Sequence, residues 1–312
     1  MRVCRNRPVV ALARSSVVTI GNFDGVHLGH QALIDYCLSV CNVDDRLAVV
    51  TFEPLPRAFF DPDKAPPRLN TPTEKLRLLD KAGADLVWMM RFDAELARVG
   101  PEDFVREVLV ESLAARHVVT GGDFRFGHRR EGDLELMRAL GARHGFESQI
   151  VDTVTLDGQR VSSGAVREAL ARSDFVSAAA MLGRPYSVSG RVLRGRRLGR
   201  KLGYPTANVK IRALPCPLQG IFAVRARAEG DLWRPAVASL GWRPMFGGED
   251  MLLEVHYFDF EADLYGLRLE TEFVAKLRDE AHFATIEDMV RQMKSDEAQA
   301  RTILGTGAWI TE

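Results

Sequence analysis

Two histidines lie three residues apart where a β-branched stretch gives way to a glycine-containing turn. The segment reads GNFDGVHLGH over residues 21–30. Glycines let a backbone turn sharply and approach a ligand, and the free N–H groups at a helix start attract phosphate. His27 and His30 can both face such a site across the first helical turn and donate hydrogen bonds to phosphate oxygens. The string therefore predicts nucleotide binding; zinc is an alternative that would need further ligands.

The same string also allows a simpler interpretation, a strand-to-helix turn that carries two surface histidines. Its position directly after a buried strand favours the nucleotide site. Gly29, between the histidines, is expected to leave room for the nucleotide. The predicted phosphate-binding residues of this segment are Gly21, Asn22, Phe23, Asp24 and Gly29.

A second anion-binding signal is VSSGAVR at residues 161–167. Ser162 or Ser163 can cap the helix that follows, whose start then faces anions. Arg167 lies one turn inside that helix and can clamp a triphosphate with its planar guanidinium. For Ser163, plain capping without any ATP is the alternative interpretation.

Aromatic and charged side chains alternate at Asp123, Phe124, Arg125 and Phe126. This pattern suits the stacking of an aromatic ring system, and it equally suits the end of a buried strand. The residue types alone leave both interpretations open.

Glycine and arginine are densest over residues 190–208, which end in PTAN. The near absence of aromatic residues disfavours a nucleic-acid patch, whereas repeated glycines among cations suit a loop that wraps phosphates. Thr206 and Asn208 point to the same side of an extended segment, and their oxygens suit Mg²⁺; a proline-initiated turn is the alternative. The predicted phosphate-binding residues are Gly190, Gly195, Gly199 and Lys201.

These motifs together resemble the bacterial bifunctional riboflavin kinase/FAD synthetase family, and the first one resembles the wider nucleotidylyltransferase superfamily. The resemblance extends along almost the whole chain. It also includes TFEPLP at 51–56, GGDFRFG at 121–127, LEVHYFDF at 253–260, LRDE at 277–280 with Phe283, and the terminal helix.

The resemblance implies an enzyme that phosphorylates riboflavin to FMN and then adenylylates FMN to FAD, with ATP as co-substrate and Mg²⁺ as cofactor. It implies that Thr206 and Asn208 hold the metal and that Glu254 is the base for the riboflavin hydroxyl. By residue type alone, Glu254 would be a solvated strand-face residue. The implied catalytic residues are His27, His30, Arg167 and Glu254, and the implied flavin contacts are Asp123, Phe124, Phe126, Arg278, Glu280 and Phe283.

Four positions depart from the family pattern and touch both halves of the chain. Leu55 replaces a histidine, Gly164 a threonine, Ser239 an asparagine and Met245 a threonine. A chain with only one of the two activities, or a flavin- or nucleotide-binding regulator without turnover, is therefore the alternative function.

The elements that must position these residues change character near residue 184. Continuous apolar runs at 16–20, 47–52, 86–90, 118–121 and 148–151 alternate with helical patterns at 28–40, 71–83, 101–113 and 133–144. Such runs predict a doubly wound α/β domain with a parallel sheet covered on both faces. Short helices follow at 165–171 and 175–182.

Beyond residue 184, closely spaced glycines and alternating segments, clearest at 221–226 and 252–258, predict a small antiparallel β-barrel. A terminal helix is expected over 286–303. We expect residues 1–184 to form the FMN adenylyltransferase domain and residues 185–312 the riboflavin kinase domain.

Composition narrows the class of protein. The 42 basic and 42 acidic residues balance, so net charge gives no support for nucleic-acid or membrane partners. No apolar run reaches the length of a membrane span, and the short apolar stretch 9–13 does not read as a signal peptide. The four cysteines lack zinc spacing, which favours reduced thiols in the cytoplasm. The oligomeric state stays open.

Overall fold

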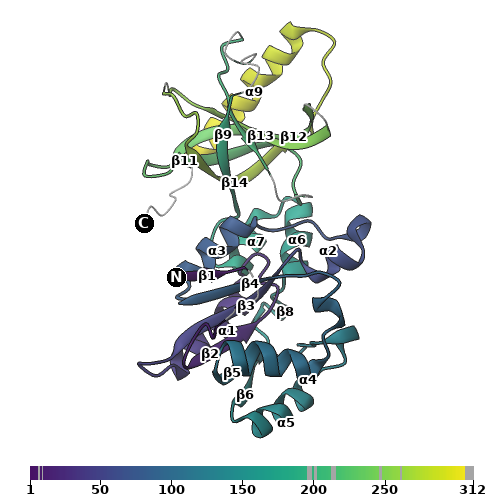
Figure 1. Ribbon diagram of the computed structural model, residues 1–312. Coiled ribbons are helices and arrows are strands. Elements are labelled where there is room, and N and C mark those ends of the chain that lie inside the picture. The colour runs from purple at the N-terminus through teal and green to yellow at the C-terminus, as the bar shows by residue number, and fades with distance from the viewer. Residues whose placement is uncertain are drawn as a thin grey trace. The chain divides into compact units, whose positions relative to one another are not determined.

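The computed structural model describes residues 1–5, 8, 10–194, 199, 202–211, 216–245, 248–260 and 262–305, with backbone alone for 243–245 and 248–250 (Figure 1). The chain divides into two compact units, which are described separately. The first unit is Met1–Pro66 with Asn70–Ser163, and the second is Pro67–Leu69 with Gly164–Glu312.

The first unit contains a six-stranded sheet with the order β1-β4-β3-β2-β5-β6. All neighbouring pairs are parallel. The five expected runs are all strands, and a short edge strand at the N-terminus was not expected. The strands are β1 (Arg2–Cys4), β2 (Ser16–Ile20), β3 (Arg46–Glu53), β4 (Leu86–Arg91), β5 (Ala115–Gly121) and β6 (Glu147–Val151).

Helices cover both faces of this sheet, as continuous apolar strands require. Helices α1 (Leu28–Val40) and α3 (Pro72–Lys81) pack on one face. On the other face lie α5 (Leu134–His144) and the helix that starts as α4 (Pro101–Phe104) and continues as a π-helical segment (Val105–Ser112). The remaining short elements are α2 (Pro56–Phe60), three 3₁₀ turns (Pro62–Lys64, Leu96–Arg98 and His128–Arg130), and the hairpin β7 (Thr155–Leu156) with β8 (Gln159–Arg160).

Apart from Pro67–Leu69, the second unit begins at Gly164 within helix α6 (Ser163–Ala171). It continues with α7 (Phe175–Leu182) and then forms a closed barrel with the order β10-β13-β12-β11-β14-β9. Every pair in the barrel is antiparallel. Helix α9 (Ile286–Gly305), yellow in Figure 1, packs along it on β11, β12 and β14. The predicted fold class is thus confirmed. The strands are β9 (Ser187–Leu193), β10 (Ala207–Lys210), β11 (Gly220–Ala228), β12 (Arg234–Met245), β13 (Gly248–Tyr257) and β14 (Arg268–Arg278).

A buried carboxylate ties the loop before β3 to β5. Asp45 accepts hydrogen bonds from Ser15 Oγ (2.5 Å), from the Asn42 amide (2.8 Å) and from Arg116 Nη2 (2.6 Å). Arg116 also donates to the Val40 carbonyl. The hydrogen bond from Arg116 is the main cause that lowers the pKa of Asp45 to about 2, with further hydrogen bonds from Ser15 and Asn42.

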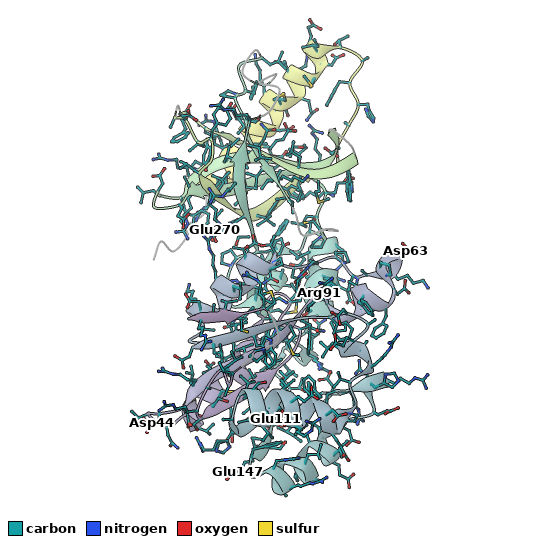
Figure 2. All side chains as sticks on the ribbon, viewed as in Figure 1. Asp44, Asp63, Arg91, Glu111, Glu147 and Glu270 are labelled. Atoms are coloured by element: carbon teal, nitrogen blue, oxygen red, sulfur yellow. The ribbon has the colours of Figure 1, made fainter. Side chains whose placement is uncertain are left out.

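Asp45→Asn is therefore expected to destabilise the first unit by about 2 kcal/mol at neutral pH. Because the pKa of Asp45 is lowered on folding from 3.8 to about 2, its contribution is present above the unfolded value and is lost as the pH falls between them. Thermal unfolding of both chains at neutral pH and near pH 2.5 would measure this. Asp44→Asn is the control, since Asp44 is exposed on the adjacent turn (Figure 2). An equal loss at both pH values would contradict the prediction.

Candidate active sites

The first candidate site forms at the carboxyl edge of the parallel sheet. Strand β2 lies between β3 and β5, and the chain goes from β2 to β3 on one side and only later to β5 on the other. Ligands of such sheets bind where the strand order reverses in this way. The loop after β2 carries the two histidines, and the loop after β5 carries Asp123.

The loop after β2 has an unusual backbone. Gly25 has a φ of 86°, and two residues with side chains, Phe23 and Val26, have φ values of 47° and 42°. A β-branched residue such as Val26 rarely adopts this left-handed conformation, and the strain must be offset by surrounding contacts. Phe23 and Val26 are both buried, so their packing in the core provides part of that compensation.

The two histidines lie together at the start of α1. Their ring centroids are 3.8 Å apart and stacked, and the ring of Phe23 lies 4.8 Å from that of His30. His27 is the residue before the helix and makes no side-chain cap, which leaves the first helical N–H groups for an anion. Burial, then His27 and Lys75, hold the pKa of His30 well below its usual value. His30 is therefore neutral near pH 7 and suited to hydrogen bonding rather than to charge pairing.

Gly29 lies against the His27 ring. A Cβ atom at this position would lie 3.1 Å from Cε1 of the His27 ring and 3.5 Å from the Val161 carbonyl oxygen. The space beside Gly29 is thus filled first by His27, so the glycine fixes the imidazole. The role of Gly29 beside the nucleotide stays a prediction.

The serine motif after β8 contacts the same loop within the first unit. Ser163 Oγ donates a hydrogen bond to the Asp24 carbonyl at 2.8 Å, and Asp24 is only 1% exposed. Ser162 is half-buried. Arg167 belongs to the second unit, where its Nε donates to the Pro67 carbonyl. Its predicted role toward ATP therefore stays a prediction.

The segment after β5 is a turn and not the end of a strand, because β5 ends at Gly121. Phe126 is 5% exposed and packs in the core, where its ring stacks on that of Phe124. Asp123 forms an exposed ion pair with Arg160 of β8 at 2.6 Å. Core packing therefore accounts for Phe126 without a flavin, and the three predicted flavin contacts stay predictions.

Sequence reasoning missed an aromatic cluster at the end of β3 and β4. The rings of Phe52, Phe59 and Phe60 each lie 5.5–5.8 Å from the ring of Phe92. Phe60 is 66% exposed. The adjacent Phe59 and Phe60, shortly after TFEPLP, were the signal, and they offer an apolar surface of the kind on which a planar ring stacks.

The second candidate site is a cavity of about 350 Å³ in the second unit, within the size range of small-molecule sites. Barrel residues line one side and α9 lines the other. Half-buried Glu254 and His256 border it, while the intervening Val255 is buried in the barrel. Six predicted site residues lie around this cavity: Gly199, Thr206, Glu254, Arg278, Glu280 and Phe283.

Strand register brings three predicted site residues, Asn208, Glu254 and Arg278, into one row. Asn208 pairs with Glu254, Glu254 with Ser239, Ser239 with Ile221, and Ile221 with Arg278, across five neighbouring strands. Directly opposite residues in antiparallel strands have side chains on the same face. Asn208 therefore lies on the face that borders the cavity.

The PTAN segment is held in place by nearby groups. Asn208 Nδ2 donates to the Thr206 carbonyl at 3.3 Å, which leaves the Asn208 Oδ1 as an acceptor. His256 Nδ1 lies 2.9 Å from the Pro205 carbonyl oxygen. This contact gives His256 a structural role, since it anchors the residue before Thr206.

The predicted phosphate loop is described only in part. Gly195 and Lys201 lie outside the described residues. A Cβ atom at Gly199 would lie 2.2 Å from the Tyr204 carbonyl oxygen, and one at Gly190 would lie 2.5 Å from Cγ1 of Val209. Close packing accounts for both glycines, and their phosphate roles stay predictions.

Helix α9 borders the cavity, a contribution that sequence reasoning missed. Met289, Met293, Asp296 and Glu297 line the cavity, whereas Ala300 packs in a core cluster with Phe258. Strand β13 ends at Tyr257, so Phe258 lies just beyond it. The i, i+4, i+8 spacing of Met289, Met293 and Glu297 was the available signal.

Arg278 joins α9 to the barrel. Its Nη2 lies 2.8 Å from Asp296 Oδ2, its Nε lies 3.0 Å from Oδ1, and the Asp296 side chain is 5% exposed. The guanidinium carbon lies 5.7 Å from the centre of the Phe283 ring. Arg278, one of the predicted flavin contacts, thus also has a structural function: its ion pair with Asp296 holds α9 against the barrel.

The four departures from the family pattern have different environments. Leu55 is 6% exposed and precedes α2, and Gly164 is exposed. Ser239 Oγ donates to Glu280 Oε1 at 3.4 Å, so this replacement still offers the cavity a hydroxyl. The side chain of Met245 is not described.

Gly241 makes room for the Glu280 carboxylate, because a Cβ atom there would lie 2.3 Å from Glu280 Oε2. The resemblance implies that Glu280 contacts the flavin, so Gly241→Ala is expected to displace Glu280 and to raise KM for riboflavin about tenfold, the loss of a charge-assisted hydrogen bond. Steady-state kinetics at both sites would measure this. Gly305→Ala is the matched control, as nothing lies within 4 Å of its added Cβ. An unchanged KM would contradict the assignment of Glu280.

The described residues contain no group of three or more His, Cys, Asp or Glu side chains that could hold a metal ion. Such groups do not include the oxygens of threonine and asparagine side chains. These oxygens, next to a carboxylate, are ligands that suit Mg²⁺. The set Thr206, Asn208 and Glu254 has this chemistry.

Known protein families match the chain in two parts, one before and one after the region where the sequence passes from the first compact unit to the second. A sequence model of the FAD synthetase family matches residues 10–165, and one of the riboflavin kinase family matches residues 182–304. The bifunctional riboflavin kinase/FMN adenylyltransferase of Escherichia coli strain K12 is 41% identical over 290 residues, 93% of each chain. The corresponding protein of Pseudomonas fluorescens is 41% identical over 297 residues, 95% of each chain.

A solved structure shares the fold. It is described as a macrolide-efflux protein from Streptococcus pneumoniae, with a TM-score of 0.80 and 26% identity, and the match covers 99% of this chain and 100% of that one. Within the described part of this chain, none of the helices has the length and apolar character needed to span a bilayer.

Proposed function

We propose that this chain, which belongs to the bifunctional riboflavin kinase/FMN adenylyltransferase family, carries out its two reactions at the two sites described above. The chain phosphorylates riboflavin with ATP to give FMN, and it transfers an adenylyl group from ATP to FMN to give FAD. We assign adenylyl transfer to residues 1–184 and riboflavin phosphorylation to residues 185–312. The observation that carries this assignment is that His27, His30 and Ser163 lie in the first unit, whereas Thr206, Asn208 and Glu254 lie in the second.

In the kinase site, Glu254 would accept the proton of the riboflavin hydroxyl as that oxygen attacks the γ-phosphorus of ATP. ADP then leaves. A carboxylate at the wall of the cavity, in register with Asn208, supports this role, because a general base must lie within hydrogen-bond reach of the proton that it takes. Thr206 and Asn208 would hold Mg²⁺, which supplies charge neutralisation to the ATP phosphates when bound.

In the adenylyl-transfer site, an FMN phosphate oxygen attacks the α-phosphorus of ATP and pyrophosphate leaves. The attacking oxygen is already an anion, so the protein needs to supply only position and charge stabilisation. His27 and His30 would donate hydrogen bonds to the phosphates, together with the N–H groups at the start of α1. Arg167 would add a fixed positive charge.

The remaining assignments concern substrate contacts. We assign Arg278, Glu280 and Phe283 to the flavin of the kinase site, since all three line its cavity. Asp123, Phe124 and Phe126 are assigned to FMN in the first unit, where buried Phe126 would act through Phe124. The loop residues Gly21, Asn22, Phe23, Asp24, Ser162 and Ser163 are assigned to the ATP phosphates.

Each half-reaction can be tested separately with the purified chain. With Mg²⁺ and ATP, riboflavin should give FMN and then FAD, and supplied FMN should give FAD without riboflavin. Chromatography of the flavins at successive times measures both, and addition of EDTA should stop them. Conversion of FMN alone would leave only the first site active, and absence of both products would contradict the proposal.

A further inference from the structure

Lys75 is a lysine whose side chain is completely buried. It lies on α3, is 0% exposed and is among the largest fully buried side chains of the described residues. Removing an ammonium group from water costs several kcal/mol unless hydrogen bonds and charges compensate for it. A methionine would fill the same volume without that cost, so the position of the ammonium calls for a function.

The ammonium lies directly behind the histidine loop. Lys75 Nζ donates to the Asn22 carbonyl at 2.7 Å and to Thr51 Oγ1 at 3.3 Å. Thr51 Oγ1, at the end of β3, donates to the same carbonyl at 3.1 Å. One backbone oxygen of the loop therefore receives two hydrogen bonds, one from α3 and one from β3.

Fixing this carbonyl fixes the peptide that follows it. In a planar trans peptide the N–H of Phe23 points opposite to the Asn22 carbonyl, and it therefore faces away from Lys75. The chain then enters the left-handed conformations of Phe23 and Val26. Strain of this kind persists only where other contacts determine the backbone, and the contact with Lys75 stands at the entrance to the strained segment.

The charge also reaches the histidines. After burial and His27, Lys75 is the third cause that lowers the pKa of His30. The ammonium is therefore close enough to affect the group that would contact phosphate. A positive charge in a buried position also contributes an attractive potential for an anion bound at the loop.

We propose that Lys75 is a positioning residue for adenylyl transfer: through the Asn22 carbonyl it holds loop 21–27 in the shape that presents His27 and His30 to the ATP phosphates before the nucleotide binds. This inference rests on the proposed function of that loop. Lys75 need not touch the substrate, and its effect reaches the reaction through the backbone of the loop.

The test begins with Lys75→Met, which retains most of the side-chain volume. The expected result is a fall of about 10- to 100-fold in kcat for FMN adenylylation, with unchanged riboflavin phosphorylation on the same chain. Hydrogen exchange of the amides in loop 21–27 should become faster. Lys81→Met, at an exposed position of the same helix, is the matched control and should behave as the wild type.

Thr51 provides a second, milder variant in case Lys75→Met does not fold. Thr51→Val removes the shared hydroxyl and should lower adenylylation, whereas Thr51→Ser keeps the hydroxyl and should restore it. Because both residues act through one carbonyl, the loss in a folded double variant should be smaller than the product of the single losses.

The outcomes distinguish this inference from the site assignment when His30→Ala is assayed in parallel. If His30→Ala abolishes adenylylation while folded Lys75→Met retains the kinetics and amide exchange of the wild type, the role of Lys75 is overturned and the site stands. If Lys75→Met does not fold, unchanged adenylylation by Thr51→Val overturns it. If His30→Ala itself retains adenylylation, the site assignment fails.

Discussion

Glu254→Gln is expected to lower kcat for riboflavin phosphorylation by about 10²–10⁴-fold, the usual contribution of a general base. The amide has the size of the carboxylate but cannot take the hydroxyl proton. Because Asn208 and Ser239 are the register partners of Glu254, the exchange should leave the row of side chains intact and KM for riboflavin nearly unchanged. FMN adenylylation on the same chain should continue at the rate of the wild type.

The control for this variant is Glu287→Gln, an exposed position in the first turn of α9. Initial rates with riboflavin and, separately, with FMN give the two activities of each chain. An equal loss of both activities would show a folding defect rather than a loss of the base. Full retention of riboflavin phosphorylation would remove Glu254 from the mechanism.

His30→Ala is expected to have the opposite pattern, with FMN adenylylation lowered about 10²–10³-fold and riboflavin phosphorylation unchanged. Removing one hydrogen-bond donor from a site that stabilises developing charge has an effect of this size. The ring of His30 stacks on that of His27 and lies tilted against that of Phe23, so the alanine also leaves the His27 ring less constrained. The structural consequences should stay within the first unit.

His144→Ala, in the last turn of α5, is the matched control for His30→Ala. Rates of FAD formation from supplied FMN, measured over a range of ATP concentrations, separate an effect on KM from one on kcat. FAD formation at the rate of the wild type would exclude His30 from the site.

The fold was predictable because its signals are local. The run SVVTI at 16–20 is buried at every residue of β2, which is what a continuous apolar strand requires. The helix Phe175–Leu182 was expected with the bounds that it has, since Asp174 caps its start and Gly183 ends it in a left-handed conformation. The π-helical segment Val105–Ser112 could not be predicted, because its period differs too little from that of an α-helix over so few residues.

The sites were predictable only where their residues are neighbours in sequence. His27 and His30 lie on one helical turn, so their spacing indicated their contact. Lys75 lies on a later helix, and nothing in the sequence around it indicates that its ammonium meets the loop after β2. That contact depends on how α3 packs against the sheet, which is a tertiary property.

The row of strand residues that pairs Asn208 with Glu254 shows the same difference between local sequence signals and tertiary contacts. The PTAN motif and Glu254 could be identified separately, but their pairing depends on the register of β10 with β13. A shift of one residue would reverse every side chain of a strand, so the row could not be derived before the barrel was known. The contribution of α9 to the cavity could not be predicted either, because methionine side chains on one face of a helix serve core packing and ligand contact equally well.

Mixing the two inactivated chains tests the central claim most directly. Neither Glu254→Gln nor His30→Ala alone should convert riboflavin to FAD at an appreciable rate. An equimolar mixture should do so, because FMN made by the His30→Ala chain can be adenylylated by the Glu254→Gln chain. If the mixture stays as inactive as the separate chains, the two reactions do not reside in two independent sites, and the assignment of one reaction to each unit is wrong.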